Sequence, residues 1–484
     1  MALGGVPKLK PGRKPRNVIF CVSDGMALQT LAMAAHYRDL VLGRKGYWME
    51  LMAQEDVVTG LQDTRSLSSL VTDSAAAGSA WGSGQKVWNG MINTYPDGTK
   101  LYPIGLAARD RGMNIGLVTT TTITHATPSG FTIQIEERDL EGLIAEQHLT
   151  TGVDVLLGGG DRFFNREKRR DKMDLYTEFA KKGYRVVKDR NELLSARPGR
   201  TLGIFADGHM PYTVDRDNDP KIAEAVPTLA EMTRFAIDTL RDNDSGFLLQ
   251  VEGGRVDHGG HANDVGALIH DQLAFEEAIK VAVDFARRDG ETLVVITSDH
   301  GCGGPSLNGS GPEYFDSTAG LQAVSKIRSS YGPMLTELGS EPTVERIREV
   351  VENRQGVQLK ADEAEAMQQA LKQNSPFRLA EHKAAASSTL ALLLGNTTKV
   401  GWTGSQHTNE FTILNALGPG AERFSGIYQN SRVYDVIAEL IDVRYKNPSM
   451  TFEKAQKDRE SKKQSLNPEL REWYAQTDDE LGWH

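Results

Sequence analysis

The sequence predicts an α/β protein, a three-layer sandwich with a large, mostly parallel central sheet and a helical insertion. Two observations lead to this fold class. Between residues 17 and 300, short continuous apolar runs, typical of strands buried on both faces, alternate with helical patterns. From 303 to about 400 the apolar runs stop and helical patterns dominate. In a chain of 484 residues, this alternation favours one sheet covered by helices on both faces.

The expected elements follow one another in strand–helix order. The strands are Asn17–Val22, Ile115–Thr119, Val153–Leu157, Thr201–Phe205, Phe247–Val251 and Leu293–Thr297. The helices between them include Leu28–Tyr37, Leu140–His148, Thr228–Arg241 and Ala267–Arg288. Within the insertion, helical patterns cover Thr343–Asn353, Ala361–Lys372 and Arg378–Leu394.

We expect three parts along the chain. Residues 1–16 form a flexible basic segment, residues 17–445 form the α/β domain with its insertion at about 303–400, and residues 446–484 form a charged helical tail. Residues 1–16 have no secretory signal, so either the protein is cytosolic or a leader is missing from this sequence.

Composition argues against several classes of function. The net charge of −10 is wrong for a protein whose main partner is nucleic acid, because the phosphate backbone attracts a basic face. No apolar run approaches the length of a membrane span. The two cysteines, Cys21 and Cys302, set no disulfide framework, and we interpret them as small buried hydrophobic residues rather than as a bridge.

Metal-binding side chains follow four of the expected strands at the point where each strand ends. These residues are Asp24 after the first strand, His125 and Thr127 after the second, Glu252 after Phe247–Val251, and Asp299 and His300 after the last. In parallel α/β sheets, ligands bind beyond the carboxyl ends of the strands. Because chance would produce one or two such ends but hardly four, we expect a functional site at this rim.

The stretch from Glu252 to His261 is the richest of these strand ends. Glu252, Asp257, His258 and His261 occur within ten residues and are separated by four glycines. Glycine lets the backbone fold tightly, so that these side chains can converge. Crowded carboxylates and imidazoles need a compensating cation or partner once they are buried. A metal site is therefore favoured over a polar surface loop.

A serine stands at the head of a helix rich in small residues. Ser74 follows Asp73 and precedes an alanine run, and a helix N-terminus offers unpaired N–H groups to an anion. As an isolated motif, Asp73-Ser74 is better interpreted as a helix cap. The motif gains a chemical meaning only together with the ligands at the strand ends.

Taken together, these motifs resemble those of alkaline phosphatase. The matching segments are Val-Ser-Asp24-Gly-Met, Thr-Asp73-Ser74-Ala-Ala-Ala-Gly, Thr-His125-Ala-Thr127-Pro-Ser-Gly, Glu252…Asp257-His258…His261, Thr-Ser-Asp299-His300-Gly and Thr-Gly-Ser-Gln-His407-Thr. They come in the order of that family and span residues 17–410. The resemblance also implies that the helical insertion lies near the active site.

The resemblance implies two zinc ions, one magnesium ion and a serine nucleophile. By position, the first zinc would be held by Asp257, His261 and His407, the second by Asp24, Asp299 and His300, and magnesium by Asp24, Thr127 and Glu252. Ser74 would be the nucleophile and Arg138 would hold the phosphate. Without the family spacing, Arg138 would be interpreted as a surface arginine in an acidic run.

Two histidines, His125 and His258, are expected to contact the substrate or to tune the third metal site. An imidazole beside the oxygen-rich site makes zinc or cobalt an alternative to magnesium there. The competing interpretation is that both are packed, hydrogen-bonded histidines. The remaining histidines at 36, 148, 209, 270 and 382 match no motif, and we treat them as ordinary.

The expected activity is hydrolysis of phosphate monoesters at alkaline pH through a phosphoserine, with release of inorganic phosphate. The expected partners are small phosphomonoesters and inorganic phosphate; the sequence leaves the oligomeric state open, with a homodimer as one option. By family habit the location would be periplasmic or secreted, although a cytoplasmic location stays open. The competing hypotheses are a sulfatase or phosphodiesterase on the same scaffold and a non-catalytic protein that binds metal or phosphate.

Overall fold

A ten-stranded sheet forms the centre of the protein in the computed structural model, which describes residues 12–376 and 385–462. The strand order is β14-β2-β13-β8-β1-β7-β3-β4-β6-β5. Seven of these strands are parallel neighbours: β8 (Thr292–Thr297), β1 (Asn17–Ser23), β7 (Phe247–Gly253), β3 (Asn114–Thr122), β4 (Val155–Gly159), β6 (Thr201–Ile204) and β5 (Arg185–Val187). The predicted fold class is confirmed.

The other end of the sheet was not predicted from the sequence. There, β13 (Thr412–Leu417) runs antiparallel to both of its neighbours, β8 and β2 (Val57–Asp63), and β14 (Gly426–Gln429) pairs with β2 in parallel. The partial and uneven burial of β2 explains why its sequence lacks the apolar run that marks the central strands. Strand β5, which has only three residues and is, like β2, only partly buried, was also not predicted from the sequence.

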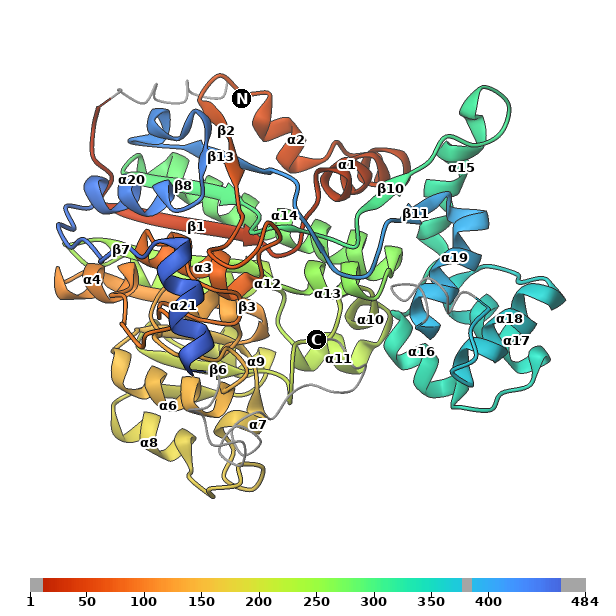
Figure 1. Ribbon diagram of the computed structural model, residues 1–484, viewed down its shortest axis with the longest axis horizontal. Helices are drawn as coiled ribbons and strands as arrows, with labels where there is room; N and C mark the ends of the chain where they lie inside the picture. Colours follow the sequence, from red (N-terminus) through yellow and green to blue (C-terminus); the bar gives the residue numbers. More distant parts are fainter. Residues whose placement is uncertain (1–11, 377–384, 463–484) are drawn as a thin grey trace.

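Two hydrophobic cores, one on each face of the sheet, make the sandwich three-layered (Figure 1). Alternate residues of β1 point to opposite faces. Ile19 and Cys21 join the core that contains α1 (Leu28–Leu42), α12 (Leu229–Leu240) and α14 (Val265–Asp289). Val18 and Phe20 join the core that contains α3 (Ser74–Ser83), α4 (Ile104–Asp110) and α20 (Arg432–Leu440).

Strand register brings the carboxyl ends of the central strands level with one another. In the pairing of β1 with its neighbours, Val22 lies opposite both Glu252 and Thr297. In the pairing of β3 with β7, Thr119 also lies opposite Glu252. Residues that follow these strands in the sequence are therefore placed at one rim of the sheet, as the parallel pattern predicts.

The helical insertion lies to the side of the sandwich (Figure 1, right). It contains α15 (Phe315–Ala323), α16 (Tyr331–Leu338), α17 (Val344–Gln355), α18 (Ala361–Leu371) and α19 (Ala386–Thr398). The expectation that strands are absent here is wrong in one respect, since the short strand β10 (Pro305–Leu307) pairs with β11 (Val400–Trp402). This antiparallel pair joins the two ends of the insertion.

Some of the sequence predictions concern residues that the structure does not describe. Residues 1–11 of the basic segment, residues 463–484 of the tail, and His382 lie outside it, as does the beginning of the helix predicted at Arg378. The tail contains α21 (Phe452–Lys462). Within the described residues, no helix is both long and apolar enough to cross a membrane.

Close backbone packing holds α3 against α5 (Ala126–Ser129). A Cβ atom at Gly82 of α3 would lie 1.9 Å from the carbonyl oxygen of Gly130, whereas a Cβ at Gly78 would meet its nearest neighbours at 3.5 Å. The first distance requires movement of the backbone, and the second is an ordinary contact. A side chain could therefore be added at Gly78 but not at Gly82 without moving the backbone, although the two glycines lie one helical turn apart.

We predict that Gly82→Ala lowers the free energy of unfolding by about 1–3 kcal/mol, because the carbonyl of Gly130 must move. Gly78→Ala is the matched control and should be neutral or slightly stabilising, because alanine favours the helix. Urea unfolding at fixed metal concentrations measures both. Equal stability of the two variants would contradict the close approach of α3 to this segment.

Candidate active site

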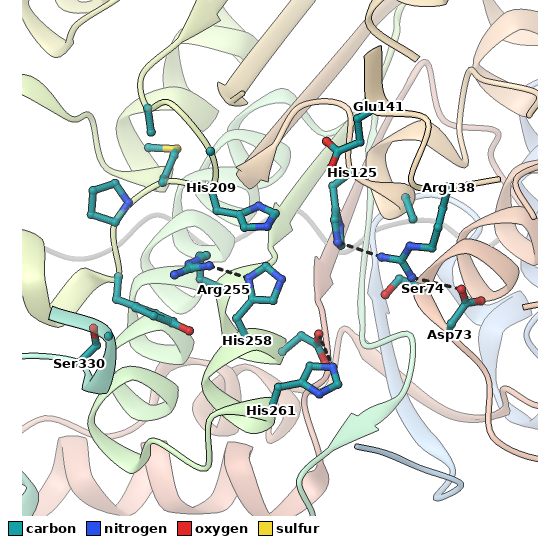
Figure 2. Close-up of a pocket in the computed structure, with 18 of the residues that line it drawn as sticks. Asp73, Ser74, His125, Arg138, Glu141, His209, Arg255, His258, His261 and Ser330 are labelled. Atoms are coloured by element: carbon teal, nitrogen blue, oxygen red, sulfur yellow. Dashed lines mark hydrogen bonds and ion pairs between the residues drawn. The ribbon is translucent and has the colours of Figure 1, made fainter. Parts of the chain in front are cut away.

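A cavity of about 1350 Å³ opens at the rim formed by the carboxyl ends of the strands (Figure 2). The cavity brings together residues that are far apart in the sequence. Its lining includes seven of the residues singled out from the sequence: Ser74, His125, Arg138, Asp257, His258, His261 and, from beyond the insertion, His407. Three groups of possible metal ligands lie at this rim, two of which share Asp24, and each contains at least one buried carboxylate.

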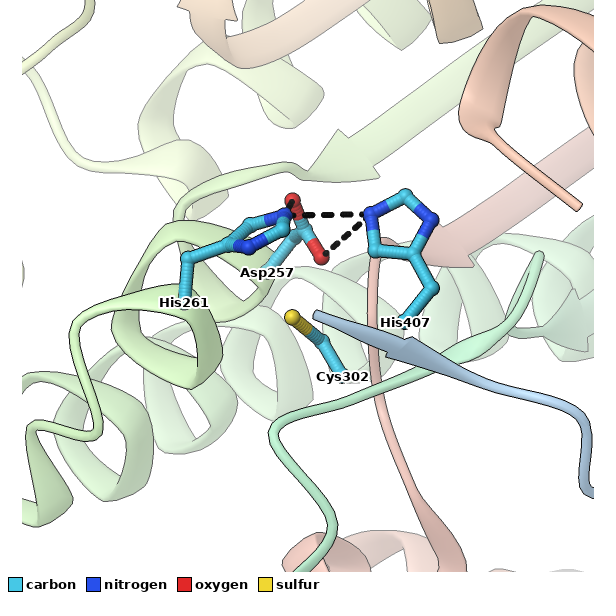
Figure 3. A group of neighbouring side chains, drawn as sticks. All are labelled: Asp257, His261, Cys302 and His407. Carbon is cyan, nitrogen blue, oxygen red and sulfur yellow. Dashed lines mark hydrogen bonds and ion pairs between the residues drawn. The ribbon is translucent and has the colours of Figure 1, made fainter. Parts of the chain in front are cut away.

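The first group consists of Asp257, His261 and His407 (Figure 3). His261 Nε2 lies 3.2 Å from Asp257 Oδ2 and 3.0 Å from His407 Nε2. Each ring uses its Nδ1–H to donate to a backbone carbonyl, at 2.7 Å for Ser405 and 2.8 Å for Thr72. When both rings are neutral, as metal ligands must be, their Nε2 atoms direct lone pairs at each other. A cation between them removes this repulsion, and these backbone contacts are the kind that orient metal-binding histidines.

Cys302 is a fourth member of the first group, and the sequence interpretation missed it. It is fully buried, as expected for a small hydrophobic residue, and neither it nor Cys21 forms a disulfide. However, its sulfur lies within 4.8 Å of the ligand atoms of the other three residues. Strand β9 (Gly301–Cys302) pairs with β12 (His407–Thr408), so that Cys302 lies opposite His407. The signal in the sequence was its position two residues after His300.

The second group consists of Asp24, Asp299 and His300. His300 Nε2 lies 3.1 Å from Asp299 Oδ2, 3.6 Å from Asp24 Oδ1 and 3.3 Å from Ser74 Oγ. The other oxygen of Asp299 accepts hydrogen bonds from the backbone N–H groups of Gly25 and His300, both at 3.0 Å. The candidate nucleophile therefore borders this group.

The third group consists of Asp24, Glu252 and His125. Thr127 also contributes a hydroxyl, which donates to Asp24 Oδ2 at 3.2 Å. Thr119 donates to Glu252 Oε2, which leaves the other oxygen of Glu252 without a hydrogen-bond partner. Asp24 belongs to both the second and the third group, so it lies where two cations could share one carboxylate.

Four buried carboxylate oxygens in these groups have no hydrogen-bond partner. They belong to Asp24, Glu252, Asp257 and Asp299. Burial, together with the negative charges of Asp299 and Asp257, raises the pKa of Asp24 far above its usual range, and burial raises the pKa of Glu252 to about 7. Such a concentration of unpaired buried acids is costly unless cations compensate it. The donor atoms and their orphaned oxygens thus fit divalent metal ions.

Ser74 begins helix α3, and the residue before it organises the surroundings. Asp73 caps the helix by accepting from the N–H of Ala76 at 2.9 Å. Its second oxygen accepts from Arg138 Nη1 at 3.2 Å and from the N–H of Gly90 at 2.8 Å. Burial opposes the positive charge of Arg138, but Asp73 and other acids raise its pKa overall. Arg138 is thereby held beside the serine (Figure 2).

Three histidines lie in the cavity between Arg138 and Arg255 (Figure 2). Arg138 Nη2 donates to His125 Nε2 at 2.9 Å, and Arg255 Nη1 donates to His258 Nδ1 at 2.8 Å. His209, which the sequence analysis treats as ordinary, lies with its ring centre 4.4 Å from that of His258. Burial and the neighbouring positive charges lower the pKa of all three histidines, to about 3 for His125. Burial therefore favours the neutral form of these rings.

Comparison with known proteins decides the family. A family model described as alkaline phosphatase matches residues 15–443. The chain belongs to the alkaline phosphatase family. It is accordingly an enzyme, a phosphoric monoester hydrolase, of a family that depends on metal ions.

Individual relatives agree with this family assignment. Alkaline phosphatase 3 of Bacillus subtilis is 32% identical over 448 residues, which cover 90% of this chain and 92% of that protein. The crystal structure of Thermus thermophilus alkaline phosphatase matches with a TM-score of 0.88 and 38% identity, covering 94% and 98% of the two chains. A histidine-to-glutamate variant of the alkaline phosphatase TAB5 has magnesium bound in its M3 site. It matches with a TM-score of 0.63 and 25% identity over 90% and 99% of the chains.

We predict that metal binding stabilises this alkaline phosphatase family member through its orphaned carboxylates. Zinc at 100 times its Kd should raise the free energy of unfolding by about 2.7 kcal/mol per site relative to the protein in chelator. Asp257→Asn should reduce this gain. The control is Asp264→Asn, because Asp264 is equally buried but its oxygens accept from the N–H groups of Ala267 and Tyr331. The idea fails if both variants keep the full gain, which urea unfolding with elemental analysis would measure.

Proposed function

We propose that this enzyme hydrolyses phosphate monoesters at alkaline pH through a phosphoserine on Ser74. The observation that carries the proposal is the position of the Ser74 hydroxyl. It lies at the N-terminus of α3, beside Arg138 and 3.3 Å from His300 in the second group of ligands. A nucleophile, a guanidinium and a cluster of acids that fits cations are the elements that phosphoryl transfer requires.

The reaction would proceed in two displacements. In the first, Ser74 Oγ forms a bond to phosphorus while the bond from phosphorus to the ester oxygen breaks and the alcohol leaves. In the second, water attacks phosphorus, the bond to Ser74 Oγ breaks, and inorganic phosphate is released. Arg138 would bind the non-bridging oxygens with its planar guanidinium, which Asp73 keeps oriented.

The donor sets suggest which metal each group would hold. The first two groups offer imidazole nitrogens with carboxylates, which suits zinc, and the third offers carboxylates and the Thr127 hydroxyl, which suits magnesium. When bound, two zinc ions supply charge neutralisation for the attacking serine oxygen and for the leaving oxygen. The chain's own part is to hold these oxygens at the rim and to keep the histidine rings oriented.

The third site is the one whose metal depends most on a single side chain. Because Arg138 donates to His125 Nε2, the ring proton of His125 sits on Nδ1. In this arrangement His125 has no lone pair left for a metal, which supports the oxygen-rich magnesium site over zinc or cobalt.

Location, assembly and the roles of the chain segments belong to the same proposal. We expect an enzyme of the periplasm or the cell exterior that acts as a homodimer on small phosphomonoesters. For the basic segment, the α/β domain with its insertion, and the tail, we propose the same boundaries as those expected from the sequence. Support comes from the family resemblance alone.

We predict that Ser74→Ala abolishes turnover of 4-nitrophenyl phosphate, because no oxygen remains to accept the phosphoryl group. The wild type should hydrolyse this monoester with zinc and magnesium at alkaline pH, lose activity in chelator, and act far more slowly on the phosphodiester and sulfate analogues. Labelling with ³²P-phosphate at low pH should mark wild type and not Ser74→Ala. Full activity of Ser74→Ala, or preference for the diester or the sulfate, would reject the proposal.

We predict that His125→Asp lowers the magnesium concentration for half-maximal activity by about tenfold, because it adds an oxygen ligand beside Asp24 and Glu252. His270→Gln is the control, since His270 lies outside these groups and contacts the carbonyl of Gly266. Magnesium titration of activity, with magnesium counted by elemental analysis, tests this. An unchanged requirement in His125→Asp would show that the third site does not include position 125.

A further inference from the structure

Arg255 is a cation of the cavity wall that has no acidic partner. It is the first residue of α13 (Arg255–His261), and its guanidinium lies 3.8 Å from the ring centre of Tyr212. Its Nη1 donates to His258 at 2.8 Å, while its Nε is buried without a hydrogen-bond partner. Within the described residues, Arg255 forms no ion pair with any carboxylate.

The other charged side chains in this part of the cavity are already compensated. Asp207 is paired with Arg162 at 2.7 Å and with Lys168 at 2.6 Å. Asp215 accepts hydrogen bonds from the backbone N–H and the hydroxyl of Ser330. Arg255 therefore differs from its neighbours. Within hydrogen-bond and ion-pair distance its positive charge meets only His258 and the face of Tyr212, while Asp271 interacts with it electrostatically from beyond ion-pair distance.

An unpaired and partly desolvated guanidinium is unfavourable in a protein unless a ligand supplies the anion. Tyr212 offsets part of this cost through a cation–π contact and also fixes the plane of the guanidinium. The planar group then presents its remaining N–H donors in a fixed orientation, which suits the oxygens of a phosphate or a carboxylate. The side chain is thus preorganised for an anion.

The position of Arg255 indicates where on a substrate this anion would be. Arg138, which would hold the reacting phosphate, is bonded to His125, and Arg255 is bonded to His258. The ring centres of His125 and His258 lie 5.8 Å apart, so two imidazole rings separate the two guanidinium groups (Figure 2). A second anion bound by Arg255 must be joined to the reacting phosphate through an organic group of several atoms.

We propose that Arg255 forms a subsite for a second anionic group, a phosphate or a carboxylate, carried on the alcohol part of a phosphomonoester substrate. The proposal rests on the proposed function and makes it more specific, because it names a substrate class. Arg255 would act in the enzyme as a specificity-determining residue on the side of the leaving group.

The experiment compares kcat/KM for two matched pairs of substrates. Fructose 1,6-bisphosphate is measured against fructose 6-phosphate, and 2-phosphoglycerate against glycerol 2-phosphate, at fixed zinc, magnesium and salt. We expect wild type to prefer the member that carries a second anionic group in at least one pair, and Arg255→Gln to reduce that preference by about tenfold. Arg255→Lys should retain part of it. The pair that responds identifies the anion as phosphate or carboxylate.

The matched control is Arg162→Gln, which removes a cavity arginine that is already paired with Asp207, and it should leave the preference unchanged. If Arg255 only orients His258, Arg255→Gln will slow all four substrates equally and the ratios will stay constant, which would overturn the proposal. The proposal is also overturned if wild type shows no preference in either pair of substrates. Absence of turnover with every substrate would instead reject the proposed function, so the two failures are distinguishable.

Discussion

The electrostatic repulsion among buried acids at one rim of the sheet is the constraint on which the site depends. Asp24, Glu252, Asp257 and Asp299 each have an oxygen that is buried and without a hydrogen-bond partner. In the absence of cations, protons must compensate this charge. Although burial works against it, Asp257 raises the pKa of His261, and Asp299 raises that of His300. Metal ions in the same positions would release these protons and use the imidazole nitrogens as ligands.

The sheet supplies this arrangement because its central strands are parallel and in level register. Glu252 lies opposite Val22, and Thr297 lies opposite the same residue from the other side. The acidic residues at or directly after the ends of these strands are consequently brought close together at the rim. Helix α3 then presents Ser74 to the second group, and its close packing against the segment that carries Thr127 connects the nucleophile to the third group.

Arginines determine how the histidines of the cavity behave. Each of His125 and His258 accepts a hydrogen bond from an arginine, which sets its tautomer, and burial together with the arginine charge lowers its pKa. Arg138 has Asp73 as its charge partner, whereas Arg255 has none in the described part of the chain. One arginine is thus committed to orienting the reacting phosphate, and the other retains capacity for a different anion. This difference is what points from a general phosphatase toward a narrower class of substrates.

The sequence by itself determined the fold class and the ligand types at the strand ends, because continuous apolar runs specify strands buried on both faces and the residues after them must lie at one rim. It could not determine β2, β13 or β14, whose pairing depends on contacts between residues hundreds of positions apart. Only the tertiary structure decided that Cys302 and His209 lie beside the site, and that Arg255 forms no ion pair with a carboxylate in the described part of the chain. Partners and burial arise from long-range packing, which a local pattern of residue types does not contain.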